Sequence, residues 1–522
     1  MERIMNSMNL NETEIEMQLE KLEQRAIALE KSALETRLEQ RRLQRALNEL
    51  RNQVNPFCRL PPELQALIFE RCVDADTKGH VLTIRALPWT LAQTCRRWRE
   101  IALSTPTLWS LFRINSGTGL VHHDPVQMAK TWLERSNPLP ISCLVILNHI
   151  PLLQGLEDTL FKLIIAQSSR WRHLDIDLKD RQDLFEQLFS IEHPLPFLRS
   201  IRVYVTLENP NAHLPVAALS SNAPDLRDAH IYATSPYALP ISLPWSQLRN
   251  LEVTFSASQD LFTVSETMHS LESCVIEVGQ LNPNLQYSLA FPTLRRFEIS
   301  GPIHGIITVL DSLQVPTLKD LHVIPAYGST LYHQHADELL SSITNFHSRC
   351  SSRLEKLATP LTLWGSPNSP RLAEALSTIA ELHIRLETEE GSQQAVQNLR
   401  DPQMLPNLKA LHLLVHKSAL PLSLFSEFVD MVEARRYSER TQQLVCLSID
   451  TVKYVGRPKI YLPASDPPFQ RLLKLEREGL VLMGSVTEEG MWRPLYTSTN
   501  AWNAEKEELR WSRFGYSEYL DD

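Results

Sequence analysis

Glycine is scarce in this chain, and its scarcity excludes several classes of enzyme. Of 522 residues, 15 are glycine and 33 are proline. A phosphate-binding loop or a dinucleotide-binding turn needs glycines at fixed offsets, and the closest fragment is the isolated Gly117-Thr118-Gly119. Nucleophile-elbow, zinc-protease and kinase motifs are also missing from the sequence. We therefore expect a protein that performs no bond chemistry and uses no cofactor.

Clustered metal ligands and long apolar runs are missing as well. The seven cysteines include no C-x-x-C pair, which predicts reduced thiols, as in the cytosol or nucleus, and no zinc site. His333 and His335 lack a third ligand, and Asp175 and Asp177 are better interpreted as a solvated strand edge. No apolar run reaches the ~20 residues of a membrane span, and the N-terminus lacks the apolar core of a secretory signal. With a net charge of −9, we expect neither a membrane nor a nucleic acid as partner.

Residues 13–52 predict one long helix with a coiled-coil stripe. Nine of its eleven a and d positions are apolar. These positions are Ile15, Leu19, Leu22, Ala26, Leu29, Ala33, Thr36, Gln40, Leu43, Leu47 and Leu50. An apolar repeat of 3.5 residues predicts a left-handed coiled coil. Two outcomes are open: the helix pairs with a second copy to give a homodimer, or it folds back on its own chain.

Residues 55–112 predict a small all-α unit with more apolar surface than it can bury alone. Its first helix has two opposite apolar arcs: Leu64, Leu67, Ile68 and Cys72 on one, Ala66, Phe69 and Val73 on the other. Such a helix needs packing partners on both sides, and a unit of under ~60 residues buries too little surface alone. A second helix over about 91–102 and a short one from Thr105-Pro106 follow. Another protein is therefore expected to complete the core.

A repeated L-x-x-φ-x-φ pattern, where φ is apolar, organises the chain from residue 171 onward. Its copies start at Trp171, Leu198, Leu226, Leu248, Leu271, Leu294, Leu318, Ile379, Leu408 and Leu444, with a weaker one at Leu354. The first seven starts lie 22 to 28 residues apart, within the range of leucine-rich repeats. Five copies begin P-x-L plus a basic residue, and helical stretches such as 180–188 and 336–346 lie between copies. The pattern predicts an α/β solenoid of strand–helix repeats over 171–485, after a connecting segment, 113–170, and before an acidic tail, 486–522.

The unit at 55–112 resembles an F-box, through Leu60-Pro61-Pro62-Glu63-Leu64, Ile68-Phe69 and Cys95-Arg96-Arg97-Trp98-Arg99. The residues that follow this motif, up to Trp109, and the P-x-L strands are similar to those of the expanded F-box family of mushroom-type fungi. The resemblance implies a substrate-recognition subunit of a cullin–RING (SCF-type) ubiquitin ligase, bound to it through a SKP-family adaptor. A protein-interaction scaffold outside a ligase is the alternative. The implied adaptor contacts, each with core packing as its alternative, are Leu60, Pro61, Leu64, Ile68, Leu91, Cys95 and Trp98.

Target binding is expected on the concave strand face of the repeats. Side chains alternate along a strand, so the residues between the apolar positions point to the open face. The candidate target-binding residues there are Arg202, Tyr204, His230, Tyr232, His322, His383 and His412. Tyrosine and arginine are common interface anchors. Because histidine titrates near pH 6.5, the histidine row predicts pH-sensitive binding. The alternative is a solvated surface that merely tolerates histidine.

Overall fold

The computed structural model divides the chain into two compact units, residues 1–71 and 72–522. The residues that the structure describes are 2–54, 56–75, 80–115, 124–147, 154–179, 181–206, 217–218, 222–234, 241–255, 265–278, 289–325, 332–350, 353–386, 392–415, 422–451, 467–483, 485–486 and 492–493. No helix among them is both long enough and apolar enough to cross a membrane. Most of the tail expected at 486–522 lies outside these residues.

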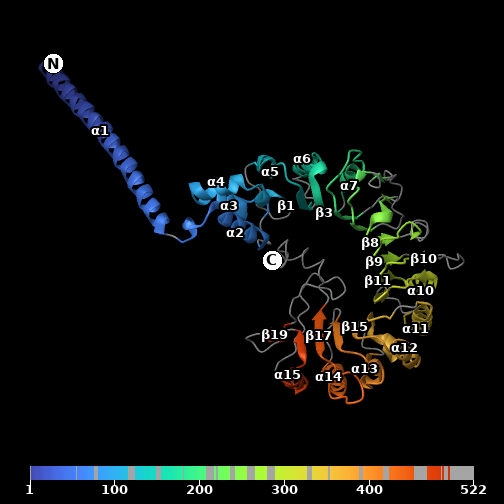
Figure 1. Cartoon of the computed structure of the whole chain (residues 1–522). Coiled ribbons are helices and arrows are strands. Elements are labelled where there is room, and N and C mark those ends of the chain that lie inside the picture. The colour runs from blue at the N-terminus through green and yellow to red at the C-terminus, as the bar shows by residue number, and fades with distance from the viewer. Residues whose placement is uncertain are drawn as a thin grey trace. The chain divides into compact units, whose positions relative to one another are not determined.

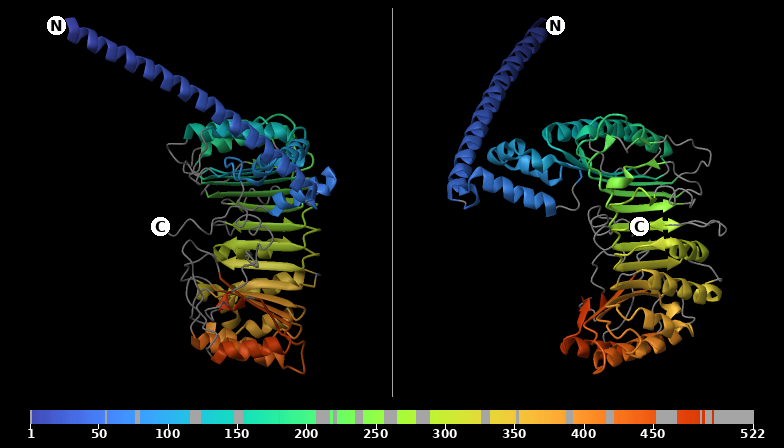
Figure 2. Two further views of the ribbon diagram at one scale, coloured as in Figure 1. Left: turned by 90° about the vertical axis from the view of Figure 1, so that its left-hand side faces the viewer. Right: turned by 45° about the vertical axis from the view of Figure 1, so that its right-hand side comes forward.

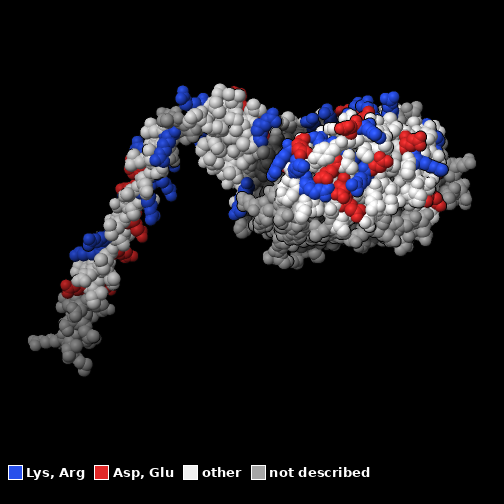
Figure 3. Space-filling view, turned by 90° about the horizontal axis from the view of Figure 1, so that it is seen from below, with Lys and Arg blue, Asp and Glu red and all other residues white. Residues whose placement is uncertain are grey.

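The first unit consists mainly of one helix, α1 (Glu2–Val54), which extends beyond the predicted range at both ends. Basic and acidic side chains are distributed along it (Figure 3). The leucines and isoleucine at its a and d positions from Ile15 to Leu50 are between 43% and 64% exposed. The predicted apolar stripe therefore lies on the surface of α1. A short helix, η1 (Phe57–Arg59), and the start of α2 (Pro62–Ala75) complete the unit.

The second unit is built on one fourteen-stranded sheet in which every strand is parallel to its neighbours. In chain order, which is also spatial order, its strands are β1 (Leu111–Asn115), β2 (Ile141–Ile146), β3 (Trp171–Lys179), β4 (Ser200–Thr206), β6 (Asp228–Thr234), β8 (Asn250–Phe255), β9 (Ser273–Val278), β11 (Arg296–Gly301), β13 (Asp320–Pro325), β14 (Lys356–Pro360), β15 (Glu381–Leu386), β16 (Ala410–Val415), β17 (Cys446–Thr451) and β18 (Val481–Met483). The strands form a curved stack (Figures 1 and 2).

Helices cover the outer side of the curve, and the strands line its inner side (Figure 1). The α-helices among the described residues of this unit, after the end of α2, are α3 (Leu87–Thr94), α4 (Arg96–Ser104), α5 (Pro125–Arg135), α6 (Gln154–Ile165), α7 (Gln182–Phe189), α10 (Ile303–Ser312), α11 (Tyr332–Arg349), α12 (Ser369–Ala375), α13 (Ser392–Arg400), α14 (Leu422–Arg436) and α15 (Pro467–Arg477). Short 3-10 helices are η2 (Pro106–Trp109), η4 (Ser168–Arg170), η5 (Trp245–Gln247) and η6 (Leu361–Gly365), and short strand pairs are β5–β7 (Ala217–Ala218, Ile241–Ser242), β10–β12 (Leu289–Ala290, Leu313–Gln314) and β19–β20 (Ser485–Val486, Trp492–Arg493). The predicted leucine-rich-repeat-like α/β solenoid is confirmed.

Each L-x-x-φ-x-φ copy forms a strand of this sheet, and its apolar positions form the core. In the copy that forms β11, for example, Leu294, which precedes the strand, and Phe297 and Ile299 within it are at most 1% exposed. The residue after the leucine of each copy fixes the stacking, because its backbone N–H donates to the same position one repeat earlier. Thus the N–H of Arg295 donates to the carbonyl of Glu272 over 2.8 Å, and that of Lys319 donates to Arg295 over 2.9 Å. The repeats consequently stack in a fixed register.

The structure also contains elements that the sequence patterns missed. The sheet begins two strands before residue 171, since β1 and β2 lie within or at the edge of the stretch interpreted as a connecting segment. The single helix expected over about 91–102 is two helices, α3 and α4, separated by an extended residue, Cys95 (φ −154°, ψ 170°). The sulfur of Cys95 accepts the N–H of Trp98 over 3.4 Å and so caps α4. A polar cap inside an apolar stripe ends one helix and begins the next.

Gly301 at the end of β11 gives a direct test of the stacking. Its φ is +136°, and an added Cβ would lie 2.2 Å from the carbonyl oxygen of Val278 on β9. Gly301→Ala should therefore destabilise the solenoid by about 2 kcal/mol or more. Gly155→Ala is the matched control, because an added Cβ there meets no atom within 4 Å, and a helical alanine stabilises by up to about 1 kcal/mol. The measurement is the midpoint of thermal unfolding. Equal midpoints for the two variants would contradict the close stacking of β9 and β11 at Gly301.

Candidate functional site

Helix α2 buries one of its two predicted apolar arcs and exposes the other. Phe69 is 2% exposed and Val73 is 9% exposed. On the other arc Leu64 is 47%, Leu67 49% and Ile68 38% exposed. Such a contiguous set of large exposed apolar side chains on one helix is typical of a protein-binding surface. We refer to Leu64, Leu67, Ile68 and the exposed Cys72 as the α2 face.

The start of α2 is held by its own neighbours in the first unit. The Nε2 of buried Gln65 donates to the carbonyls of Phe57, over 3.0 Å, and Leu60, over 2.8 Å. The rings of Phe57 and Phe69 stack with centroids 5.9 Å apart. These contacts fix the turn before the helix, where Leu60 is half-buried and Pro61 is exposed. The predicted contact residues at this end therefore remain accessible while the turn itself is rigid.

The three predicted adaptor contacts on α3 and α4 differ in exposure. Leu91 is 4% exposed, which favours its alternative role in the core. Cys95 and Trp98 are half-buried. The guanidinium Nε of Arg99 donates to the carbonyl of Ala92 over 2.7 Å and ties α4 to α3. The α3–α4 pair is thus a fixed unit in which Trp98 keeps part of its surface accessible.

A tryptophan cluster that the sequence patterns did not indicate joins α3 to η2 and α5. The rings of Trp89, Trp109 and Trp132 meet edge to face, with centroids 5.1 to 5.8 Å apart. The guanidinium of Arg135 lies 4.7 Å from the ring centre of Trp89 and 4.5 Å from that of Trp109, a cation–π arrangement. Burial lowers the pKa of Arg135. The cluster makes the second unit's helical segment continuous with the solenoid.

One row of side chains runs along the inner face of the sheet, one from each of eleven successive strands. Each member is the register partner of the next one on the neighbouring strand. The members are Asp175, Arg202, His230, Glu252, Val275, Glu298, His322, Ala358, His383, His412 and Ser448. We call this set the central row. Neighbouring strands lie about 4.8 Å apart, so successive members are in reach of one another. Five of the seven predicted target-binding residues are in the central row, and Tyr204 and Tyr232 form a pair beside it.

The N-terminal part of the central row contains side chains of opposite charge, and two stacked aromatic rings lie beside it. Arg202 Nη1 donates to Asp175 over 3.0 Å, and His230 Nδ1 lies 2.7 Å from a carboxylate oxygen of Glu252. The rings of Tyr204 and Tyr232 are nearly parallel at 7°, with centroids 4.5 Å apart. Burial, with the charge of Glu252, raises the pKa of Tyr232. The structure thus brings four predicted residues together on β4 and β6.

The C-terminal part of the central row holds the other three predicted histidines beside carboxylates. His322 Nε2 lies 2.8 Å from Asp320 and its Nδ1 lies 3.4 Å from Glu298. His383 Nε2 lies 2.8 Å from Glu381 Oε1, and His412 Nε2 lies 3.5 Å from the same oxygen. Burial, followed by the charge of His383, lowers the pKa of His412 to about 4. Burial alone would raise the pKa of Glu381, but hydrogen bonds from His383 and Lys356 outweigh it and lower that pKa to about 2.

The histidines are not the solvated residues of the alternative interpretation. His230 and His322 are each 2% exposed, and His383 is 5% exposed. Their partners are carboxylates of the same or an adjacent strand. A buried imidazole that pairs with a carboxylate is part of an organised polar network. Among the predicted target-binding residues, Arg202, Tyr204, Tyr232 and His412 are half-buried and keep part of their side chains accessible.

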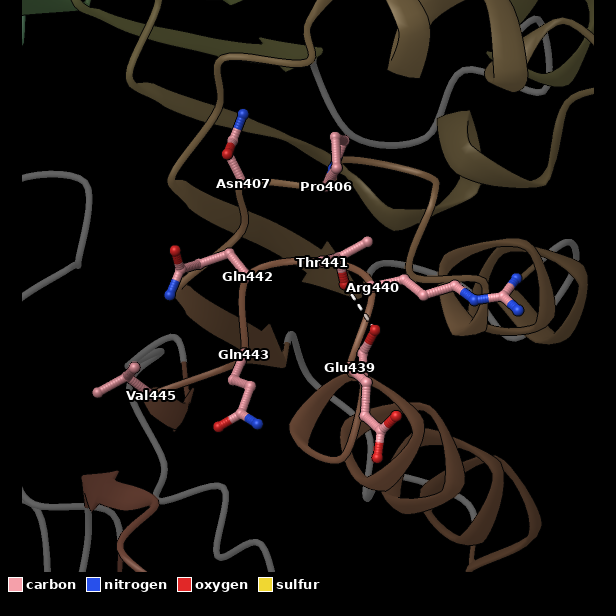
Figure 4. Close-up of a pocket in the computed structure, with 9 residues that line it drawn as sticks. Pro406, Asn407, Glu439, Arg440, Thr441, Gln442, Gln443 and Val445 are labelled. Carbon is pink, nitrogen blue, oxygen red and sulfur yellow. Dashed lines mark hydrogen bonds between the residues drawn. The ribbon is translucent and has the colours of Figure 1, made fainter.

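A shallow polar depression lies elsewhere on the solenoid, beside the loop that precedes β17 (Figure 4). Its volume is ≈ 530 Å³, and residues 406–407, 438–443 and 445 line it. The side chains of Glu439 and Arg440 point in different directions (Figure 4), while the hydroxyls of Ser438 and Thr441 lie 2.7 Å apart. None of the predicted contact residues borders it. We assign no chemistry to this depression.

Comparison with protein-family models identifies residues 57–114 as F-box-like. The match runs from η1 through α2, α3, α4 and η2 into β1, so it includes the α2 face and the α3–α4 pair. It agrees to within two residues with the boundaries expected from the sequence. No curated protein sequence matches the chain.

Proposed function

We propose that this protein is the substrate-recognition subunit of an SCF-type cullin–RING ubiquitin ligase. The F-box-like segment binds a SKP-family adaptor, and the inner face of the solenoid binds the target. The observation that carries this proposal is the α2 face: three large apolar side chains, 38% to 49% exposed, within the segment that matches the F-box-like model. From the sequence of its P-x-L strands we also propose that the chain belongs to the expanded F-box family of mushroom-type fungi.

The α2 face has the energetics that an adaptor contact requires. Fully burying a leucine or isoleucine contributes roughly 1.5–3 kcal/mol, so completing the burial of Leu64, Leu67 and Ile68 supplies a substantial part of a binding free energy. Apolar anchors at the centre of an interface usually dominate its affinity. Because Phe69 and Val73 already hold the opposite arc, the helix presents these anchors without having to reorganise.

Ile68→Glu should weaken adaptor binding about a hundredfold without unfolding the protein. The new carboxylate would be desolvated in the interface, which costs roughly 3 kcal/mol, or about a hundredfold in Kd. Binding of the full chain to a purified SKP-family adaptor, measured by titration calorimetry, checks this. Ile84→Glu is the matched control, because Ile84 is similarly exposed at 48% and lies outside the α2 face. Equal affinities for the two variants would reject the proposed interface.

The half-buried side chains of Arg202, Tyr204 and Tyr232 are proposed to anchor the target. The triple variant Arg202→Ala, Tyr204→Ala and Tyr232→Ala should leave the adaptor affinity unchanged and reduce target capture, since tyrosine and arginine anchors each contribute about 1–2 kcal/mol or more. Quantitative pull-down with isotope labelling compares the proteins retained by the variant and the wild type. Arg371→Ala on the outer helix α12, where Arg371 is exposed, serves as the control. Identical partner profiles for the triple variant and wild type would place recognition elsewhere.

The exposed stripe of α1 is proposed to pair with α1 of a second copy. Leu22→Lys together with Leu29→Lys places two charges on the a and d seam and should convert a dimer into a monomer. Leu34→Lys with Leu38→Lys is the matched control, because these leucines are 58% and 55% exposed but lie outside the seam. Sedimentation equilibrium of the full chain measures the mass. A monomeric wild type, or dissociation by the control pair, would reject this pairing.

A further inference from the structure

Three side chains on two neighbouring strands converge near the C-terminal end of the central row. Glu381 and His383 are two residues apart on β15, and His412 is the register partner of His383 on β16. The two imidazole rings stack, with centroids 4.2 Å apart and an interplanar angle of 12°. One carboxylate oxygen and one nitrogen from each ring lie within 4.8 Å of one another. All three ligand atoms therefore surround one point on the inner face of the sheet.

We propose that Glu381, His383 and His412 bind a divalent transition-metal ion of the Zn²⁺ class. Imidazole nitrogen and carboxylate oxygen are ordinary ligands of this ion, at about 2.0–2.2 Å. Tetrahedral coordination at those lengths sets neighbouring ligand atoms roughly 3.3 Å apart. The atoms of the site are already 2.8 Å (Glu381 to His383) and 3.5 Å (Glu381 to His412) apart, so small side-chain rotations suffice to form it.

The ligand side chains of the proposed metal site are held in a rigid part of the structure. Its ligands are on strands of the continuous sheet rather than on loops, and His383 is 5% exposed. Ligands whose rotamers are fixed by packing lose little freedom when the ion binds. Three protein ligands leave a fourth position open for water or for a side chain of a bound protein. His412 is 14% and Glu381 is 23% exposed, so an ion can enter from the inner face.

Lys356 on β14 tunes this site. Its ammonium lies 2.6 Å from Glu381 Oε2, whereas both histidines approach Oε1. The ammonium therefore occupies Oε2, and Oε1 is the oxygen available to the ion. Its positive charge also opposes a cation a few ångströms away, although its side chain is 46% exposed and partly screened by water. We expect a site that binds the ion reversibly, with an affinity that rises when this charge is removed.

A second group of possible ligands provides an internal control. His304 on α10 and His335 and Glu338 on α11 also bring three ligand atoms within 4.8 Å. His304 and Glu338 are exposed, and the group lies on helices that cover the outer side of the sheet. Exposed side chains of this kind lose more freedom on binding than the fixed ligands of β15 and β16. A substitution at His304 therefore distinguishes general surface binding from the proposed site.

The test is equilibrium dialysis of the full chain, stripped with chelator, against Zn²⁺, with bound metal measured by mass spectrometry. Co²⁺ serves as a second probe, because its visible absorption reports coordination by nitrogen ligands. We expect His412→Asn and Glu381→Gln each to weaken binding about tenfold or more. Lys356→Met should strengthen binding roughly tenfold, and His304→Asn should leave it unchanged. Circular dichroism checks the fold, and Glu381→Gln decides if His412→Asn is misfolded.

Three results would overturn the site. The first is no saturable binding of Zn²⁺ or Co²⁺ by the wild-type chain. The second is unchanged binding in both His412→Asn and Glu381→Gln, whatever the effect of His304→Asn. The third is unchanged or weaker binding in Lys356→Met, because the ion would then not lie beside that ammonium. None of these measurements involves an adaptor or a target, so the site stands or falls independently of the proposed ligase role.

Discussion

In-register stacking of parallel strands is the constraint on which the solenoid depends. Each repeat buries the apolar positions of its L-x-x-φ-x-φ pattern, and the residue after its leucine donates a backbone hydrogen bond to the same position of the previous repeat. Register is therefore set from both the core and the backbone. A slip of one residue would move every apolar side chain to the opposite face, so the inner face has one possible order of side chains.

The fixed register places equivalent residues of successive repeats side by side, and these residues form the central row. The α2 face has a different origin, because α2 is not part of the repeats. Along the sheet, equivalent positions of successive repeats contact one another, so arginine, histidine and glutamate side chains that are distant in sequence become pairs such as His230 with Glu252. The α2 face lies on a helix that precedes the repeats. On that helix Leu64 and Ile68 are exposed. On the solenoid face in Figure 3, acidic and basic side chains are interspersed without a broad patch of one sign.

Local sequence patterns predicted the helices and strands, whereas the register of the strands determines which side chains meet on the inner face. All eleven copies of the repeat pattern became strands, and the two arcs of α2 divided as their periodicity indicates. The strands β1 and β2 were missed because they lack the leucine spacing of the later copies, and Cys95 was not recognised as a helix cap. The convergence of Glu381 with His412 was out of reach, because the length of the intervening segment does not specify which residues pair. A recurrent histidine at one repeat position was the only signal.

We propose that an adaptor covers the α2 face, and the thiol of Cys72 reports on that face. Cys72 is exposed, one helical turn after Ile68, and no disulfide occupies it. The decisive measurement is the alkylation rate of Cys72 in the full chain, followed by peptide mass spectrometry with and without a purified SKP-family adaptor. Our account predicts that a saturating adaptor slows alkylation of Cys72 while half-buried Cys446 on β17 reacts at an unchanged rate. An unchanged rate at Cys72 with the adaptor bound would contradict it.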